Sequence, residues 1–198
     1  MSGRFARVCV YAGSAPGARP EYTEASTAII EELARRGSGV VYGGGSLGLM
    51  GVLADAAMAA GGTVTGVIPR FLDDREVSHH GVDLRVVETM HERKMLMAEL
   101  ADAFLVLPGG IGTLEEVAEM LSWSQLGLHR KPIGLFDVGG FWEPLVALLD
   151  HMTAEQFVGY DHRRLLLSSS DPVELLDAME AWEAPRMARR WMTDDEQT

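Results

Sequence analysis

The chain is poor in cysteine and in long apolar runs. Its 198 residues include one cysteine, Cys9, so neither a disulfide framework nor a paired-cysteine metal site can form within it. No apolar stretch approaches the length that a membrane span requires, and residues 1–7 lack the apolar core of a signal peptide. We therefore expect a cytoplasmic protein, in a compartment where thiols stay reduced, that has no membrane partner.

Basic residues are scarce as well. The 17 Lys and Arg residues face 29 Asp and Glu residues, which gives a formal net charge of −12. A nucleic-acid partner is not expected, because binding to a phosphate backbone requires a basic face that displaces counterions. A small anionic ligand remains compatible, since backbone N–H groups and a few local cations are enough to hold one.

Glycine is abundant, in contrast, and apolar strand-like runs alternate with helical segments along the whole chain. Strands are expected at residues 5–11, 39–42, 63–68, 84–87, 103–107 and 132–136, with a short edge strand at 164–167. Helices are expected at residues 21–36, 47–60, 89–101, 113–126, 141–152 and 172–182, and residues 70–81 are predicted to be polar and irregular. Such alternation is typical of an α/β protein with a parallel sheet of six or seven strands covered by helices on both faces. We interpret residues 1–198 as a single domain with a frayed acidic end at about 193–198.

The segment 107–116, with the sequence LPGGIGTLEE, follows one of these buried strands and opens a helix. Its three glycines remove side chains where the chain turns, and Thr113 is expected to cap the helix. The free N–H groups and the dipole of a helix N-terminus form an anion site that suits a phosphate. Glu116 is expected in the first helical turn, where a carboxylate also favours the helix dipole, so a purely structural role stays open.

A second glycine-rich segment follows the strand at 39–42. Gly43, Gly44 and Gly45 are expected to present bare backbone amides to a ligand, although a tight turn beside a closely packed helix would also need them. The segment is neither a P-loop, which requires Gly-Lys-Ser/Thr, nor a good GxGxxG fingerprint. Ser14, in the turn after the first strand, is a further candidate donor to a phosphate or a ribose.

Charged residues outside the glycine segments are weaker candidates. Arg93 and Lys94 lie early in the helix at 89–101, where a solvated charge pair is the alternative interpretation. Glu76, in the polar stretch 70–81, is a candidate acceptor for a sugar or a base, and the alternative is a solvated loop acid. The adjacent residues His79 and His80 do not converge on one ion, so no metal site is predicted.

Three motifs occur together in one order and spacing: GGGxxGLMG at 43–51, MxxRK at 90–94 and PGGxGTxxE at 108–116. In this combination the chain resembles the LONELY GUY family, the cytokinin riboside 5′-monophosphate phosphoribohydrolases, which have long been mislabelled as lysine decarboxylases. The resemblance runs from about residue 8 to residue 150 and includes 122–127 and 131–135. The stretch beyond residue 151 resembles nothing diagnostic.

The resemblance implies a Rossmann-like, doubly wound fold and a homodimer with active sites near the subunit interface. It implies that a water molecule cleaves the N-glycosidic bond of an N6-modified adenosine 5′-monophosphate, without a cofactor, and releases the free base and ribose 5-phosphate. Arg93 and Glu116 would be the catalytic pair. The residues implied to contact the nucleotide are Glu76, Lys94, Gly110, Ile111, Gly112, Thr113, Leu114, Glu115 and Ser122. Met97, Met120 and Trp123 are candidate walls for the N6 substituent, and the last two are equally compatible with a core or a subunit interface.

Two other functions are weighed against this one. A pyridoxal-phosphate decarboxylase requires a lysine for its Schiff base, and the chain has only Lys94, inside the nucleotide motif, and Lys131, just before a strand. A nucleotide or molybdenum-cofactor carrier would need the glycine segments. It would not need the pair formed by Arg93 and Glu116.

Overall fold

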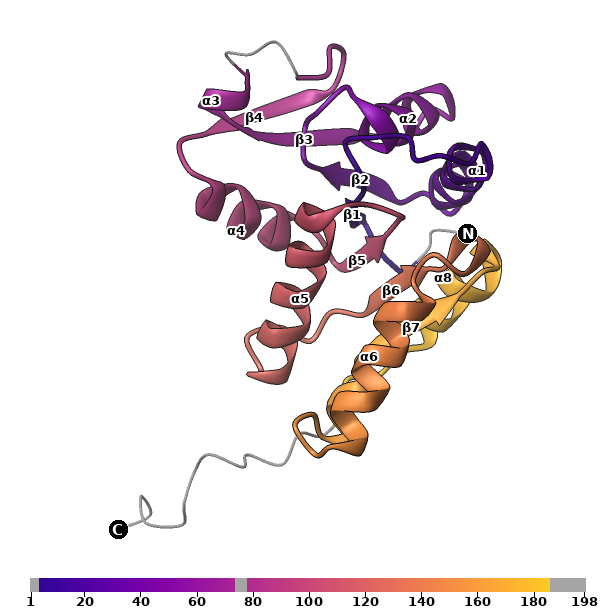
Figure 1. Ribbon diagram of the computed structural model, residues 1–198. Helices are drawn as coiled ribbons and strands as arrows, with labels where there is room; N and C mark the ends of the chain where they lie inside the picture. The colour runs from indigo at the N-terminus through magenta and orange to yellow at the C-terminus, as the bar shows by residue number, and fades with distance from the viewer. Residues whose placement is uncertain (1–3, 74–77, 186–198) are drawn as a thin grey trace.

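The structure is a computed structural model that describes residues 4–73 and 78–185. Its centre is a sheet of seven strands in the order β4-β3-β2-β1-β5-β6-β7, and every neighbouring pair is parallel (Figure 1). The strands are β1 (Arg7–Tyr11), β2 (Gly39–Tyr42), β3 (Val64–Pro69), β4 (Asp83–Val87), β5 (Ala103–Val106), β6 (Ile133–Phe136) and β7 (Leu166–Ser169).

Helices cover both faces of this sheet, as Figure 1 shows. The helices are α1 (Glu21–Arg35), α2 (Gly48–Ala59), α3 (Arg70–Asp73), α4 (Met90–Leu100), α5 (Ile111–Gln125), α6 (Glu143–Ala154), α7 (Tyr160–Arg163) and α8 (Pro172–Ala181). One face carries α1, α2 and α8, and the other carries α4, α5 and α6. The prediction of a Rossmann-like, doubly wound parallel sheet is confirmed.

The two helical layers enclose two apolar cores, one on each side of the sheet. Strand β1 contributes to both: Val8 and Val10 lie in the core under α1 and α2, whereas Cys9 and Tyr11 lie in the core under α4 and α5. Successive side chains of a strand point to opposite faces. A central strand must therefore be apolar at every position, which explains the unbroken runs in the sequence.

The chain reverses direction across the sheet between β1 and β5. From β1 it winds outward through β2, β3 and β4, then crosses back to β5 and winds outward the other way to β7. The loops that follow β1 and β5 therefore diverge at the carboxyl edge of the sheet. In folds of this kind the resulting crevice is where ligands bind.

Several predicted boundaries differ from the structure. Helix α5 begins at Ile111 rather than at 113, and its N-cap is Gly110, so Thr113 does not cap it and Glu116 falls in the second helical turn. Strand β7 lies two residues beyond the predicted 164–167. The short helix α3 forms at the start of the segment that was predicted to be irregular.

The last helix, α8, is capped by Asp171, which accepts hydrogen bonds from the N–H groups of Val173 and Glu174. Glu76 and the acidic end at 193–198 lie outside the described residues. Within the described ranges, each helix is too short or too polar to cross a membrane.

Candidate functional site

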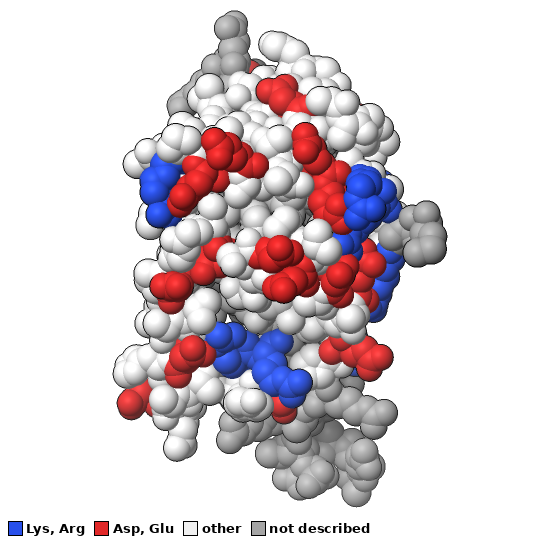
Figure 2. Space-filling model, turned by 90° about the vertical axis from the view of Figure 1, so that its right-hand side faces the viewer, with Lys and Arg blue, Asp and Glu red and all other residues white. Residues whose placement is uncertain are grey.

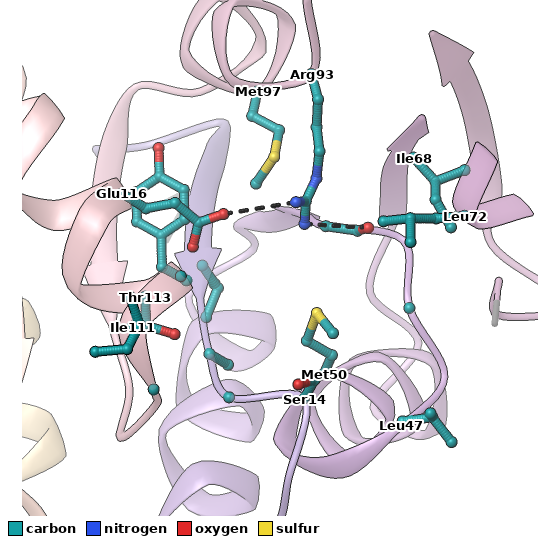
Figure 3. A pocket seen from close by; sticks show the side chains of 18 residues that line it. Ser14, Leu47, Met50, Ile68, Leu72, Arg93, Met97, Ile111, Thr113 and Glu116 are labelled. Carbon is teal, nitrogen blue, oxygen red and sulfur yellow. Dashed lines mark hydrogen bonds and ion pairs between the residues drawn. The ribbon is translucent and has the colours of Figure 1, made fainter. Parts of the chain in front are cut away.

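A cavity of about 420 Å³ opens at the carboxyl edge of the sheet, where β1 and β5 diverge (Figure 3). Strand ends, glycine turns and the beginnings of four helices contribute to its wall. The described lining residues are Val10, Tyr11, Ala12, Gly13, Ser14, Gly43, Gly45, Leu47, Met50, Ile68, Leu72, Arg93, Met97, Gly110, Ile111, Gly112, Thr113 and Glu116. The three motifs that are separate in the sequence thus meet at one cavity.

The guanidinium group of Arg93 is fixed at the edge of the sheet. Helix α4 begins with a capping box in which Thr89 and Glu92 satisfy each other's backbone N–H groups, and this places Arg93 in the first turn, facing the sheet. Its Nε donates to the carbonyl of Val67 at 3.2 Å and its Nη2 to that of Gly43 at 3.4 Å. Two strand ends therefore hold one side of the guanidinium, and Nη1 is directed toward α5 (Figure 3).

Glu116 faces Arg93 from α5. Its Oε1 lies 3.9 Å from Nη1 of Arg93, and both side chains are 11% exposed. This distance allows attraction between the charges but is too long for a hydrogen bond. Burial raises the pKa of Glu116 to about 7, against the opposing attraction of Arg93. A carboxyl group with such a pKa can exchange protons near neutrality, as catalytic acids and bases do.

Gly43 makes room for this arginine. A Cβ atom at position 43 would collide with Nη2 of Arg93 and would lie 3.4 Å from Sδ of Met50. The next residue, Gly44, has φ of +75°, a backbone conformation that favours glycine. The glycines at 43–45 therefore leave space for the Arg93 guanidinium and allow the turn, in addition to exposing backbone amides.

Two helices point their N-termini toward the cavity. The N-cap residues are Gly110 for α5 and Leu47 for α2, and neither provides a side-chain hydrogen bond to its helix. Both N-cap residues line the cavity. The first N–H groups of a helix lack partners within the helix and carry the positive end of its dipole. The cavity therefore offers two anion-binding ends, and neither has an acid in its first turn.

The remaining wall is apolar. In Figure 3, Leu47, Met50, Ile68 and Leu72 lie across the cavity from Thr113 and Glu116. They come from the start of α2 and from the end of β3 with the short helix α3 that follows it. One side of the cavity is therefore polar and charged, and the other suits an apolar group.

The chain matches known proteins over most of its length. Residues 50–179 match a family model described as "Possible lysine decarboxylase". The chain is 47% identical over 180 residues to the cytokinin riboside 5′-monophosphate phosphoribohydrolase LOG of Oryza sativa subsp. japonica, and the alignment covers 90% of this chain and 74% of that protein. It is 44% identical over 181 residues to the phosphoribohydrolase LOG7 of Arabidopsis thaliana, covering 91% of this chain and 83% of that one. The chain belongs to this LOG family.

Solved structures with the same fold are more distant. A molybdenum cofactor carrier protein from Chlamydomonas reinhardtii aligns with a TM-score of 0.67 and 22% identity over 90% of this chain and 96% of that one. A molybdenum cofactor binding protein from Rippkaea orientalis aligns with a TM-score of 0.65 and 21% identity over 90% and 97% of the two chains. At this identity the likeness shows the fold alone.

Most of the residues that the LOG motifs implicate converge on the cavity. Catalytic candidates Arg93 and Glu116 line it, together with Ser14, Gly43, Gly45, Gly110, Ile111, Gly112 and Thr113. Gly44 lies just behind its wall, against Ile68 and Leu84. Glu76 falls outside the described residues.

Lys94, Leu114, Glu115 and Ser122 lie away from the described lining of the cavity. Lys94 forms ion pairs with Glu115 and Glu119, and its side chain is 8% exposed. Leu114 is partly exposed on α5, and Ser122 is exposed near the other end of that helix. Their contacts with a nucleotide stay predictions.

The sequence interpretation missed several cavity residues. Tyr11, Leu47, Ile68 and Leu72 line the cavity, and each lies at or just beyond the carboxyl end of a strand. That position was the available signal, because the carboxyl ends of parallel strands share one edge. Of the three candidate walls for an N6 substituent, only Met97 lines this cavity.

Met120 is fully buried in the core, and Trp123 lines a second cavity of about 430 Å³ beside α4 and α5. Lys131 lines that second cavity too, and its Nζ donates to the carbonyl of Ala98 at 2.6 Å. The two lysines of this LOG-family chain are therefore absent from the described lining of the first cavity. A Schiff base at the Arg93–Glu116 site would need a lysine, and the described lining of the cavity contains none.

The described residues contain no group of three or more His, Cys, Asp and Glu side chains that could hold a metal ion. His79 instead pairs with Asp55, with 3.2 Å between Nε2 and Oδ1.

Proposed function

We propose that the protein hydrolyses the N-glycosidic bond of an adenosine 5′-monophosphate that carries a substituent on N6, releasing the free base and ribose 5-phosphate. One observation carries this proposal: a buried carboxyl group with a pKa raised to about 7 faces a fixed arginine in a cavity with two helix N-termini that lack side-chain caps. The printed names of the LOG relatives support it.

Glu116 supplies the chemistry in this proposal. Cleavage of an N-glycosidic bond develops positive charge on the sugar, as in glycoside hydrolysis. The carboxylate of Glu116 stabilises that charge and accepts a proton from the attacking water. Arg93 is always charged, and its Nη1, which faces Glu116, orients that carboxylate and donates to the substrate.

The 5′-phosphate binds at the helix N-termini. The N–H groups near Gly112 and Thr113 hold it, helped by the turn at Gly43–Gly45 and by the hydroxyl of Ser14. Binding of this remote group positions the sugar against Glu116, so that binding energy serves the reaction. No metal is required for these contacts.

The apolar wall receives the N6 substituent. Leu47, Met50 and Leu72 offer a surface that an unsubstituted adenine would leave in contact with water. Burial of a small alkyl or alkenyl group there contributes roughly 25 cal/mol per Å² of apolar surface. We therefore expect a preference for N6-alkylated nucleotides over AMP.

The decisive experiment incubates the protein with AMP and with N6-isopentenyl-AMP and detects the free base by chromatography. The wild-type protein is expected to release base, and Glu116→Gln and Arg93→Ala are expected to abolish release while the fold stays intact by circular dichroism. Near-normal turnover in either folded variant would contradict the assigned pair. Binding of AMP by calorimetry without release in the wild type would instead support a nucleotide carrier.

We further propose a single-domain, cytoplasmic protein that forms a homodimer. Exposed apolar side chains on and just after α4 and α5 support the dimer: Met95, Leu126 and Leu128 are 47%, 63% and 68% exposed. Apolar surface of this kind is characteristic of subunit contacts.

A further inference from the structure

The segment 78–81 crosses the glycine turn of the cavity on its way to β4. Ser78 forms an isolated antiparallel bridge with Gly45. The backbone N–H of His79 donates to the carbonyl of Gly44 at 2.8 Å. These contacts secure the turn. A single bridge has few hydrogen bonds, so its position depends on what fastens the crossing segment.

A side-chain contact fastens the segment to α2. Nε2 of His79 lies 3.2 Å from Oδ1 of Asp55, and the His79 side chain is only 11% exposed although Asp55 is largely in solvent. One helical turn further, Met58 lies beside Gly81, with its Sδ 3.6 Å from where a Cβ atom would be. The segment therefore lies along α2 and crosses the turn that precedes this helix.

The position of this turn determines the position of the Arg93 guanidinium. The carbonyl of Gly43 accepts the 3.4 Å hydrogen bond from Nη2 of Arg93, a length at which a small shift of the turn would break it. On the sheet side, a Cβ atom at Gly44 would be 3.0 Å from Cβ of Ile68, so the turn has little space to retreat. His79 contacts the turn at Gly44, and Ser78 contacts it at Gly45.

We propose that His79 and Asp55 are positioning residues for the turn at Gly43–Gly45 and, through it, for Arg93. Neither residue belongs to the described lining of the cavity. Asp55 pulls the imidazole of His79 toward α2, the backbone of His79 holds the carbonyl of Gly44, and the turn presents the carbonyl of Gly43 to Arg93.

The test compares His79→Ala, Asp55→Ala and the double variant with His80→Ala as the matched control. His80 is the adjacent, exposed histidine. Four quantities are measured: kcat and KM with N6-isopentenyl-AMP, the dissociation constant of AMP by calorimetry, Tm, and hydrogen exchange of the amides at 43–47. The activity readout rests on the proposed function, whereas binding and exchange do not.

Both single variants are expected to lower kcat/KM about tenfold or more, because displacement of a catalytic group by a fraction of an ångström is costly. Exchange at 43–47 is expected to accelerate in both. Tm is expected to be nearly unchanged in the Asp55 variant, because Asp55 is largely exposed, and to fall modestly in His79→Ala, because the His79 side chain is largely buried. The double variant is expected to be no worse than either single variant, which is the behaviour of residues that act as one unit. His79→Gln, which keeps a side-chain donor for Asp55, is expected to restore most of the activity.

Three results would overturn the proposal: a lower Tm with unchanged kcat/KM, multiplicative losses in the double variant, or an equal effect of His80→Ala. If the wild-type protein releases no base, the proposed function fails, and the exchange rates at 43–47 still decide the role of His79. Unchanged exchange at 43–47 in His79→Ala would then refute the positioning role of His79.

Discussion

At the scale of single residues, the carboxyl group of Glu116 sets the chemistry of the cavity. It is buried beside a fixed guanidinium, yet burial outweighs that attraction and raises its pKa to about 7. A nearby arginine usually lowers the pKa of a carboxyl group. Here the 3.9 Å separation leaves no hydrogen bond to do so. The group can therefore take up and release a proton at physiological pH.

The pH dependence of turnover follows from this pKa. Glu116 accepts a proton only when it is ionised, so kcat/KM is expected to rise with pH through about 7 and to level off above it. The rate of base release from N6-isopentenyl-AMP between pH 5 and 9 measures the effect. A flat profile across that range would show that another group carries the proton.

The same burial has a cost in stability. The folded protein binds the Glu116 proton more tightly than the unfolded chain, so the cost is absent below the unfolded value of 4.5, grows as pH rises and is complete above about 7. A shift of this size corresponds to about 3 kcal/mol at most. Glu116→Gln is therefore expected to raise the free energy of unfolding by about 1 to 3 kcal/mol at pH 8 and to leave it unchanged at pH 4.5.

Urea unfolding at the two pH values measures this difference. Glu31→Gln, a change at an exposed acid of α1, is the control and should have no comparable effect. Equal stability of Glu116→Gln and the wild type at pH 8 would contradict the expected cost of burying the carboxylate.

At the scale of elements, one arginine joins α1 to α8. The Nε of Arg36 lies 2.8 Å from Oε1 of Glu32 in α1, and its Nη1 lies 2.7 Å from Asp177 and 3.2 Å from Glu180 in α8. The arginine side chain is 11% exposed. The three acids would repel one another if it were removed, so the network holds the last helix against the first.

Arg36→Met keeps the apolar stem of the side chain and removes its charge. We expect it to lower the free energy of unfolding by about 1 to 2 kcal/mol, more than an isolated surface ion pair contributes. Arg35→Met is the matched control, because Arg35 is 70% exposed and, among the described residues, pairs with Glu32 alone, and we expect a loss below about 0.5 kcal/mol. Equal losses in the two variants, measured in urea, would show that Arg36 joins the helices no better than a surface pair.

At the scale of the whole molecule, the distribution of charge and apolar surface bears on its partners. The face in Figure 2, which carries α1, α2 and α8, shows many acidic side chains with the basic ones in small clusters. The formal net charge of −12 agrees with this view. The apolar surface at α4 and α5 lies on the other side of the sheet, where a second copy of the chain can bind without meeting this acidic face.

Leu128→Asp tests the homodimer. A carboxylate in the centre of an apolar contact would be desolvated without a partner, so we expect a dimer for the wild type and a monomer for the variant in analytical ultracentrifugation. Val173→Asp, at an exposed position of α8, is the control and should leave the dimer intact. A monomeric wild type, or a dimeric Leu128→Asp, would contradict the proposed interface.

Local patterns in the sequence predicted the strands, the helices and the glycine turns. Alternating apolar and helical segments predict the parallel sheet, because strands buried on both faces must be apolar throughout. The glycines after β2 and β5 were identified by their position after strands, since such positions share one edge of the sheet. The catalytic role of Glu116 was implied by the resemblance to the LOG family. The start of α5 was misplaced because Gly110, without a capping side chain, serves as N-cap through its extended backbone.

Contacts between distant segments were decided by the tertiary structure. Arg93 and Lys94 are neighbours in one motif, yet Arg93 faces Glu116 while Lys94 faces Glu115 and Glu119. The rotation of α4 against the sheet separates their roles, and long-range packing fixes that rotation. The sequence by itself therefore determined the fold class and the elements that reach the site. Only the tertiary structure decided which side chains meet there, because strand order and helix rotation depend on contacts between residues far apart in the chain.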